Sequence, residues 1–229
     1  MASGSRLRLS IVYDSEALRG FETGWGFSAL LSINGLKILF DCGWDGHILR
    51  RNLGRIGHAL SDIRILFLSH AHWDHMGGLS EVLEDVALPE CLNVIVHEGF
   101  SKRLREEIAK RATVTAVSAP QEIAPGVWST GPLGTDIKEH ALVVSTASGG
   151  VMLTGCAHPG VTSMLGRASE LRPVTAIVGG LHSAKISEFR GRFERIVACH
   201  CTQAKAELIK AFPGIASIGK AGESYEFGR

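Results

Sequence analysis

Four side chains that can bind a metal ion lie within six residues of this chain. They belong to the run 70–75, HAHWDH, which follows the apolar segment 63–68 after a single serine. A loop that crowds three imidazoles and a carboxylate is costly unless something compensates the clustered polar atoms. A divalent cation supplies that compensation, so the run predicts a metal site. Its candidate ligands are His70, His72, Asp74 and His75.

Three further histidines also follow apolar runs that are typical of strands. Residues 151–154 lead to His158, and two later runs lead to His182 and His200. Active sites of α/β proteins gather at the carboxyl ends of strands, so we expect these histidines to converge with the run 70–75. We predict His158 and His200 as ligands. His182 could be a ligand as well. It could equally support a ligand from behind or contact the substrate.

The spacing indicates how two ions would be shared. Residues i and i+2 of an extended segment point the same way, so the first two histidines of the run can grip one ion. The last two residues of the run follow a turn and can reach a second ion. The first predicted set is His70, His72 and His158, and the second is Asp74, His75 and His200.

Open coordination positions would make this a catalytic centre. A metal ion lowers the pKa of bound water, which gives a hydroxide nucleophile near neutral pH. Asp74 could also orient that water or accept a proton, so we predict Asp74 and His182 as catalytic residues. We expect two zinc ions, with manganese or iron as alternatives.

The remaining histidines that we considered have simpler interpretations. They are His47, His58, His97 and His140. A histidine outside such a pattern is usually a hydrogen-bonded surface or core residue. Only His140 stays open as an alternative ligand, because it lies close in sequence to the strands of the second half.

The elements that must position these residues alternate between short apolar runs and helical patterns. We predict strands at 7–13, 28–33, 36–40, 63–68, 93–96, 141–146, 151–154, 174–178 and 196–198. We predict helices at 98–111, 161–171, 187–195 and 202–212, with Thr202 as a possible cap. Asn34-Gly35 is a strong two-residue hairpin signal, and a second hairpin is predicted across 148–150. This order favours an α/β sandwich of two sheets with helices outside.

The composition narrows the classes of binding partner that we expect. The 229 residues carry a formal net charge of +1, which gives no electrostatic footprint for nucleic acid or an anionic membrane. We therefore expect a small-molecule substrate, and leave the number of subunits open. Five irregularly spaced cysteines favour reduced thiols and a cytoplasmic protein. The polar start, residues 1–6, has no apolar signal region and could be disordered or left over from cloning.

The motifs resemble those of the metallo-β-lactamase superfamily. The run 70–75 followed by Gly77-Gly78 matches its H-x-H-x-D-H-x-G-G hallmark, and segment 39–43, LFDCG, resembles its L-F-D-x-G. The resemblance implies a four-layer αββα sandwich in one domain over residues 1–229. It also implies that Asp41 supports the metal-binding loop without being a ligand.

A narrower resemblance is to the metal-dependent hydrolase branch that includes archaeal dihydropterin-ribofuranosylaminobenzene-phosphate synthase-like proteins. It rests on segments 154–160 (TGCAHPG), 178–182 (VGGLH) and 199–202 (CHCT). In segment 24–28 (GWGFS), Trp25 or Gly24 stands where that branch usually has His.

One position departs from the superfamily pattern. Cys156 occupies the place of an Asp that usually bridges two metals, and His158 is the natural substitute for the usual third-motif His. A thiolate ligand would favour zinc over harder metals. Alternatively, Cys156 is a small buried residue, or it lies behind the ligands and one ion is held tightly.

These observations favour a metal-dependent hydrolase acting on a small phosphate-bearing or related ester. Pro159-Gly160 could offer N–H groups to an anion, or simply start a helix. Lys185 and Arg190 could hold a phosphate, or be solvated charges. The alternatives are a lactone or thioester hydrolase, a di-iron redox protein, and a metal-stabilised binding protein without turnover.

Overall fold

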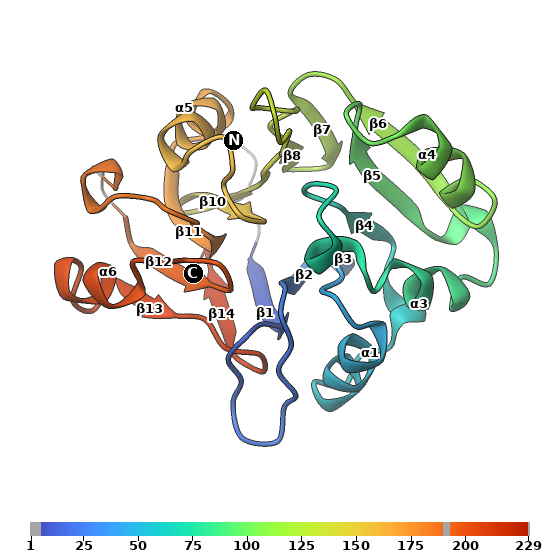
Figure 1. Ribbon diagram of the computed structural model, residues 1–229, viewed down its shortest axis with the longest axis horizontal. Coiled ribbons are helices and arrows are strands. Elements are labelled where there is room, and N and C mark those ends of the chain that lie inside the picture. Colours follow the sequence, from blue (N-terminus) through green and yellow to red (C-terminus); the bar gives the residue numbers. More distant parts are fainter. Residues whose placement is uncertain (1–5, 190–192, 229) are drawn as a thin grey trace.

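The computed structural model describes residues 6–189 and 193–228. Of the segment 1–6, the structure describes only Arg6, so the prediction about that segment lies outside the described residues. In the described chain, fourteen strands form two seven-stranded sheets (Figure 1). The first sheet has the order β14-β1-β2-β3-β4-β5-β6 and the second β13-β12-β11-β10-β9-β8-β7.

Each half of the chain builds most of one sheet. The first sheet comprises β1 (Leu7–Tyr13), β2 (Ser28–Ile33), β3 (Leu36–Phe40), β4 (Ile65–Phe67), β5 (Asn93–His97), β6 (Thr113–Val117) and β14 (Ser224–Phe227). The second comprises β7 (Gln121–Ala124), β8 (Val127–Ser129), β9 (Leu142–Thr146), β10 (Gly149–Thr154), β11 (Val174–Gly180), β12 (Arg195–Cys199) and β13 (Ala216–Ile218). Of the described strands, only β14 crosses to the sheet of the other half, where it pairs with β1.

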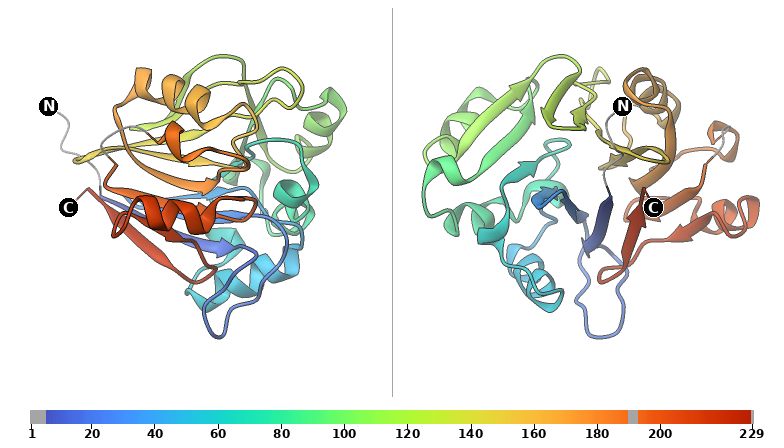
Figure 2. Two further views of the ribbon diagram at one scale, coloured as in Figure 1. Left: turned by 60° about the vertical axis from the view of Figure 1, so that its left-hand side comes forward. Right: turned by 180° about the vertical axis from the view of Figure 1, so that it is seen from behind.

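The sheets pack face to face, and the helices cover their outer faces (Figures 1 and 2). The first sheet carries α1 (Gly46–Arg55), α3 (Leu79–Glu84) and α4 (Lys102–Ile108), and the second carries α5 (Val161–Leu171) and α6 (Lys205–Ala211). One apolar cluster, which includes Phe40, Phe67 and Val178, lies between the sheets. Two further clusters lie under the helices. This arrangement confirms the predicted four-layer sandwich.

Both predicted hairpins form. Asn34 and Gly35 have φ values of 49° and 82°, the left-handed backbone that a two-residue turn needs, and Ile33 pairs with Leu36. In the second hairpin Thr146 pairs with Gly149, so the turn is one residue earlier than predicted.

Two predicted helices differ from the structure. The helix predicted at 187–195 is only a 3-10 turn, Ile186–Glu188, and β12 already begins at Arg195, while residues 190–192 are outside the described chain. Thr202 does not cap a helix, since its hydroxyl accepts the Leu181 N–H at 3.0 Å and donates to the Cys199 carbonyl at 2.8 Å. It ties two strand ends together instead, and α6 starts at Lys205.

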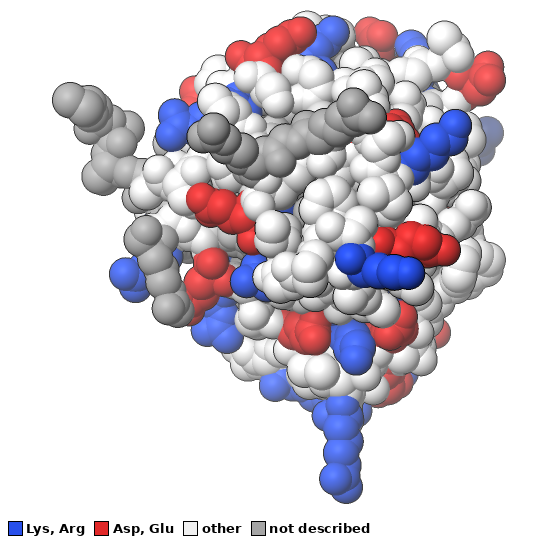
Figure 3. All heavy atoms as spheres, turned by 90° about the vertical axis from the view of Figure 1, so that its left-hand side faces the viewer, with Lys and Arg blue, Asp and Glu red and all other residues white. Residues whose placement is uncertain are grey.

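The distribution of surface charges and the lengths of the helices agree with the near-neutral composition of the chain. On the side that carries α5 and α6, acidic and basic side chains are interspersed (Figure 3). Among the described residues, no helix combines the length and apolar character that crossing a membrane requires.

His140 is a core residue that ties the two sheets together. It is fully buried and stacks on Phe67 at 4.1 Å. Its Nδ1 accepts from the Ser129 hydroxyl at 2.8 Å and its Nε2–H donates to the Leu68 carbonyl at 2.8 Å. The ring is therefore neutral, and burial lowers its pKa to about 3. The simpler interpretation of His140 agrees with this environment.

This neutral histidine predicts a pH-dependent stability. Its folded pKa of about 3 lies below the unfolded 6.5, so acidification protonates only the unfolded chain. Its contribution is fully present above pH 6.5 and is lost as the pH falls toward 3. We expect about 2 kcal/mol to be lost between pH 6.5 and 5. Urea unfolding of the metal-free protein measures this.

The matched variant is His140→Gln, which cannot titrate. It should be less stable than the wild type at pH 7.5, and the difference should shrink by about 2 kcal/mol at pH 5. A constant difference across this range would mean that His140 is not neutral in the native state.

Candidate metal centre

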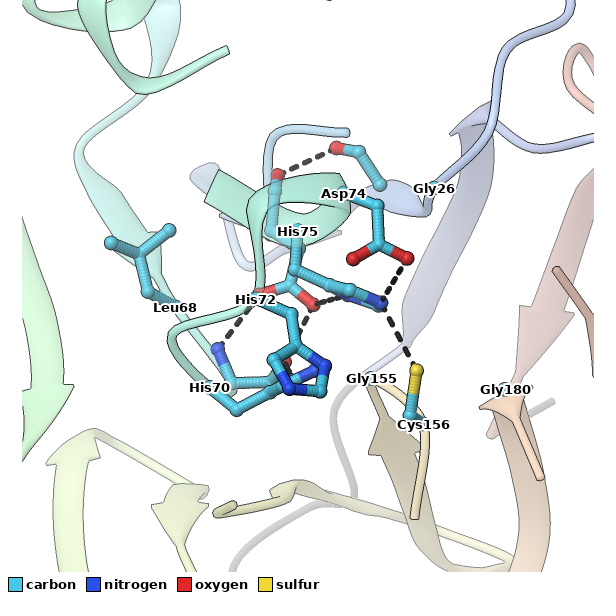
Figure 4. A network of polar contacts seen from close by, with 12 residues as sticks. Gly26, Leu68, His70, His72, Asp74, His75, Gly155, Cys156 and Gly180 are labelled. Carbon is cyan, nitrogen blue, oxygen red and sulfur yellow. Dashed lines mark hydrogen bonds and ion pairs between the residues drawn. The ribbon is translucent and has the colours of Figure 1, made fainter. Parts of the chain in front are cut away.

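The carboxyl ends of four strands deliver the predicted site residues to one place. The run 70–75 follows β4, His158 follows β10, His182 follows β11 and His200 follows β12. The structure brings together all seven predicted ligands, His70, His72, Asp74, His75, Cys156, His158 and His200. Figure 4 shows several of these side chains turned toward one another.

His70 presents an unsatisfied nitrogen to this cluster. The residue is fully buried, and its Nδ1 lies 2.9 Å from the Ser69 hydroxyl. That hydroxyl donates to Asp41, so it accepts from His70 Nδ1–H and leaves the lone pair on Nε2. Nε2 is buried without a hydrogen-bond partner among the described residues. Burial and the neighbouring imidazoles hold the pKa of His70 well below its usual range, which suits a lone-pair donor.

Asp41 organises the loop from behind. Its Oδ1 accepts the Ser69 N–H at 2.7 Å, and its Oδ2 accepts from the Ser69 hydroxyl and from His75 Nδ1, both at 2.7 Å. His75 therefore turns Nε2 toward the cluster. These contacts are those that the motif resemblance implies for Asp41.

Asp41→Asn should weaken metal binding while keeping the fold. With its NH2 group in the place of Oδ2, the amide would lose both contacts of that oxygen, from the Ser69 hydroxyl and from His75 Nδ1, and free the His75 ring to rotate. We expect a 10–100-fold lower zinc affinity, as is typical when a group orienting a ligand is removed. Competition with a chromogenic chelator measures the affinity. An unchanged affinity in a folded variant would mean that Asp41 does not orient His75.

His72 and His158 face each other across the opening of the cluster. His158 Nε2 lies 3.2 Å from His72 Nδ1, and the ring centroids are 4.7 Å apart. Burial and the neighbouring imidazoles lower the pKa of His158 to about 4, and burial also lowers that of His72. The two neutral rings, with His70, could hold a cation.

Asp74, His75 and His200 form the other side. Asp74 Oδ2 lies 2.9 Å from His200 Nε2 and 3.7 Å from His75 Nε2. Burial raises the pKa of Asp74, but the His200 hydrogen bond and the electrostatic attraction of the His75 and His200 rings outweigh it and lower the pKa to about 2. Gly26 N–H donates to His200 Nδ1 at 3.2 Å, so His200 Nε2 carries the proton that Asp74 accepts. Metal binding at this nitrogen requires loss of that proton.

Cys156 lies between the two sides. It is 3% exposed, and its Sγ lies 3.2 Å from His75 Nε2 (Figure 4). Its sulfur groups with His70 and His158, and equally with His75 and His200, with all donor atoms of each group within 4.8 Å. This position is the one that a donor shared by two ions would need.

Glu139, which sequence reasoning missed, holds the loop that carries Cys156. The buried carboxylate accepts four backbone N–H groups, from Gly155, Cys156, Ala157 and His158, at 2.9 to 3.1 Å. Burial raises the pKa of Glu139, and these donors oppose the rise. No local sequence signal marks the residue, because its partners lie 16 to 19 positions later.

Asp14 plays a similar part for His200, and sequence reasoning missed it too. Its Oδ2 accepts the His200 N–H at 2.9 Å, which fixes a residue whose φ of 27° is left-handed. Trp25, one of the two residues that could stand where the branch usually has His, packs edge-on against the His200 ring at 4.5 Å and is 58% exposed.

His182 lies at the edge of the cluster, beside an open pocket. Its ring centroid is 5.0 Å from that of His158. A pocket of about 420 Å³ is lined by both histidines, by Gly160 at the start of α5, and by Lys185. Arg190, the other predicted phosphate contact, is outside the described residues.

The donor set fits a divalent metal ion. Imidazoles, a carboxylate and a thiol converge, and the buried lone pair of His70 has no protein partner in the described chain. An unpaired buried polar atom costs about 1–3 kcal/mol, which a cation at this position would offset. Among the described residues, His47 and His58 lie at the surface and His97 is a buried residue at the end of β5.

Comparisons with known proteins agree with this fold. A family model described as the metallo-beta-lactamase superfamily matches residues 26–200. The uncharacterized protein MJ0448 of Methanocaldococcus jannaschii is 26% identical over 239 residues, covering 86% of this chain and 91% of that protein. From the same organism, 7,8-dihydropterin-6-methyl-4-(beta-D-ribofuranosyl)-aminobenzene-5'-phosphate synthase is 25% identical, covering 82% and 84%. The solved structure of Tm1679, a metal-dependent hydrolase of the beta-lactamase superfamily, matches with a TM-score of 0.76 at 23% identity, over 97% of this chain and 100% of that one.

Proposed function

Because the chain belongs to the metallo-beta-lactamase superfamily, as its motifs predict, we propose that it is a metal-dependent hydrolase of a small phosphate-bearing ester. The observation that carries the proposal is the buried Nε2 of His70, which has no partner in the described chain and lies within a convergent set of donors. A ligand must keep its lone pair free, whereas a buried structural histidine usually has its nitrogens paired. Since His97 Nε2 is also buried without a partner among the described residues, it is the convergence of further donors on His70 that distinguishes the site.

Two groups of donors would hold two zinc ions. The first is His70, His72 and His158, and the second is Asp74, His75 and His200, with Cys156 facing both. When bound, such ions lower the pKa of water and stabilise negative charge that develops on an ester oxygen. Imidazole and thiolate donors favour zinc, and manganese or iron are the alternatives.

The residues around the donors would position water and substrate. Asp74 is ionised at neutral pH, since its pKa is about 2, so its carboxylate can accept a hydrogen bond from water and orient it. His182 borders the pocket next to His158 and is placed to contact a substrate there. We therefore assign Asp74 and His182 the catalytic roles.

The pocket favours a phosphate group. Lys185 supplies a positive charge, and α5 directs its N-terminal end, at Gly160, toward the same space. Backbone N–H groups and a lysine are a common pair of phosphate contacts. The name of the archaeal synthase contains a 5'-phosphate, which agrees with this choice.

A substrate panel tests the proposal. The zinc-loaded protein would be assayed with bis-p-nitrophenyl phosphate, p-nitrophenyl phosphate, a γ-lactone and an S-acyl thioester. We expect metal-dependent turnover that is highest for a phosphate ester. Turnover confined to the lactone or thioester would replace the proposed substrate class, and no turnover of any substrate by the fully loaded protein would favour a binding protein.

Lys185→Ala is the matched variant for the phosphate contact. Loss of one charge-assisted hydrogen bond should raise KM for the phosphate ester about 10-fold. KM for an uncharged lactone should not change. An equal effect on both would show that Lys185 does not contact phosphate.

A further inference from the structure

In the described part of the chain, a third group of metal-capable side chains lies beside the two used above. Cys156, His182 and Cys201 place their donor atoms within 4.8 Å of one another. Cys201 has no part in the proposed hydrolysis. The group therefore calls for its own explanation.

The fold builds this group at the ends of three neighbouring strands. Cys156 follows β10, His182 follows β11 and Cys201 follows β12. Gly180, at the end of β11, makes room for the Cys201 sulfur. A Cβ there would lie 2.6 Å from Cys201 Sγ, closer than real Cβ atoms come. His182 also has a left-handed φ of 43°, which is costly for a residue other than glycine and is typical of functional sites.

The donors of this group are prepared for a soft cation. His182 Nδ1 is buried and has no hydrogen-bond partner among the described residues. Cys156 and Cys201 bring two sulfurs into the same group, and a bound soft cation would hold both as thiolates. Two sulfurs and one imidazole form a known zinc ligand set that leaves a fourth position open.

We propose that Cys156, His182 and Cys201 form a third, soft-donor metal position that competes with the hydrolytic pair for Cys156. All three donor groups share the Cys156 sulfur. An ion held by His182 and Cys201 would therefore draw Cys156 away from the space between His70 and His75. The competition for Cys156 rests on the proposed function, whereas the third metal position does not. Thiolate donors select zinc, cadmium or cuprous copper, so excess ions of this kind would inhibit the enzyme.

Cadmium titration of the reduced, metal-free protein tests the position, because each thiolate–cadmium bond absorbs in the ultraviolet. The wild type should show the charge-transfer intensity of two bound thiolates. Cys201→Ser should retain about half of it. Cys91→Ser, which removes a thiol from the 3-10 turn Pro89–Cys91, should match the wild type. Equal intensities in the wild type and Cys201→Ser would overturn the proposal.

A second variant guards against misfolding of the first. His182→Ala keeps both sulfurs. It should weaken the binding of cadmium at this third position, followed by the thiolate absorption, at least about 10-fold. An unchanged affinity would remove His182 from the position. Circular dichroism verifies the fold of each variant.

Inhibition by zinc tests the competition. Excess zinc beyond two equivalents should lower turnover of the wild type, and should lower that of Cys201→Ser less, each relative to its own maximum. If cadmium reports two thiolates but zinc inhibits both proteins equally, the competition is wrong. Because the cadmium band needs no turnover, the metal position can stand even where the proposed hydrolysis fails.

Discussion

Replacing His72 with alanine should abolish hydrolysis and leave the fold intact. The residue is half-buried, and the polar contact that the structure gives it is with His158 Nε2 at 3.2 Å. Losing it costs little stability, less than about 1 kcal/mol. Loss of the ion between these rings would remove several kcal/mol of transition-state stabilisation, so we expect activity to fall about 10³-fold or more.

Three measurements define this result. Metal analysis should show about one zinc fewer per chain, circular dichroism should be unchanged, and kcat/KM for the phosphate ester should fall. His47→Ala is the control, since that side chain is exposed and touches Glu81 rather than the cluster. Full activity of His72→Ala with an undiminished zinc content would show that His72 is not a ligand.

Replacing Glu139 with alanine should be the most destabilising of these changes. It leaves four backbone N–H groups of the loop 155–158 without their acceptor in a buried place. Each unsatisfied group costs about 1–3 kcal/mol, and removing a buried charge offsets part of this. We expect the free energy of unfolding of the metal-free protein to fall by about 4 kcal/mol in urea.

Two companion variants separate the loss of the four buried hydrogen bonds from the removal of a carboxylate as such. Glu122→Ala removes a carboxylate that accepts one N–H, from Gly126 at an exposed turn, and should cost less than about 1 kcal/mol. Glu139→Gln keeps the shape but turns one oxygen into a donor, and should lower zinc affinity 10–100-fold. If Glu139→Ala unfolds at the same urea concentration as the wild type, the carboxylate does not hold the loop.

The strands that carry the site could be predicted because their signals are local. An apolar run followed by a small residue and a histidine predicted the ends of β4 and β10, and Asn34-Gly35 predicted the first hairpin. The motifs predicted the superfamily and its four layers, which are confirmed. The assignment of each ligand, the catalytic roles of Asp74 and His182, and the single-domain organisation stay predictions.

Other elements escaped because their signals are weak or distant. In α1, glycines at both ends mask the helix, although Asp45 caps it by accepting the His47 N–H at 2.8 Å. The strand β6 has an exposed, weakly apolar pattern. Pairing of β14 with β1 joins the two ends of the chain, which no short window can reveal.

The supports of the site were also beyond local patterns. Asp14 reaches His200 across 186 positions and Glu139 reaches four later amides. Cys201 was visible only as part of a motif, because its relation to Cys156 and His182 depends on three strands ending side by side.

The central claim is that this cluster holds metal ions, and zinc-edge anomalous diffraction from crystals of the reduced, zinc-loaded protein tests it most directly. We predict two anomalous peaks, one among His70, His72 and His158 and one among Asp74, His75 and His200, each within reach of Cys156 Sγ. A map without a peak at the donor atoms of His70 and His75, from protein with bound zinc elsewhere, would contradict the account.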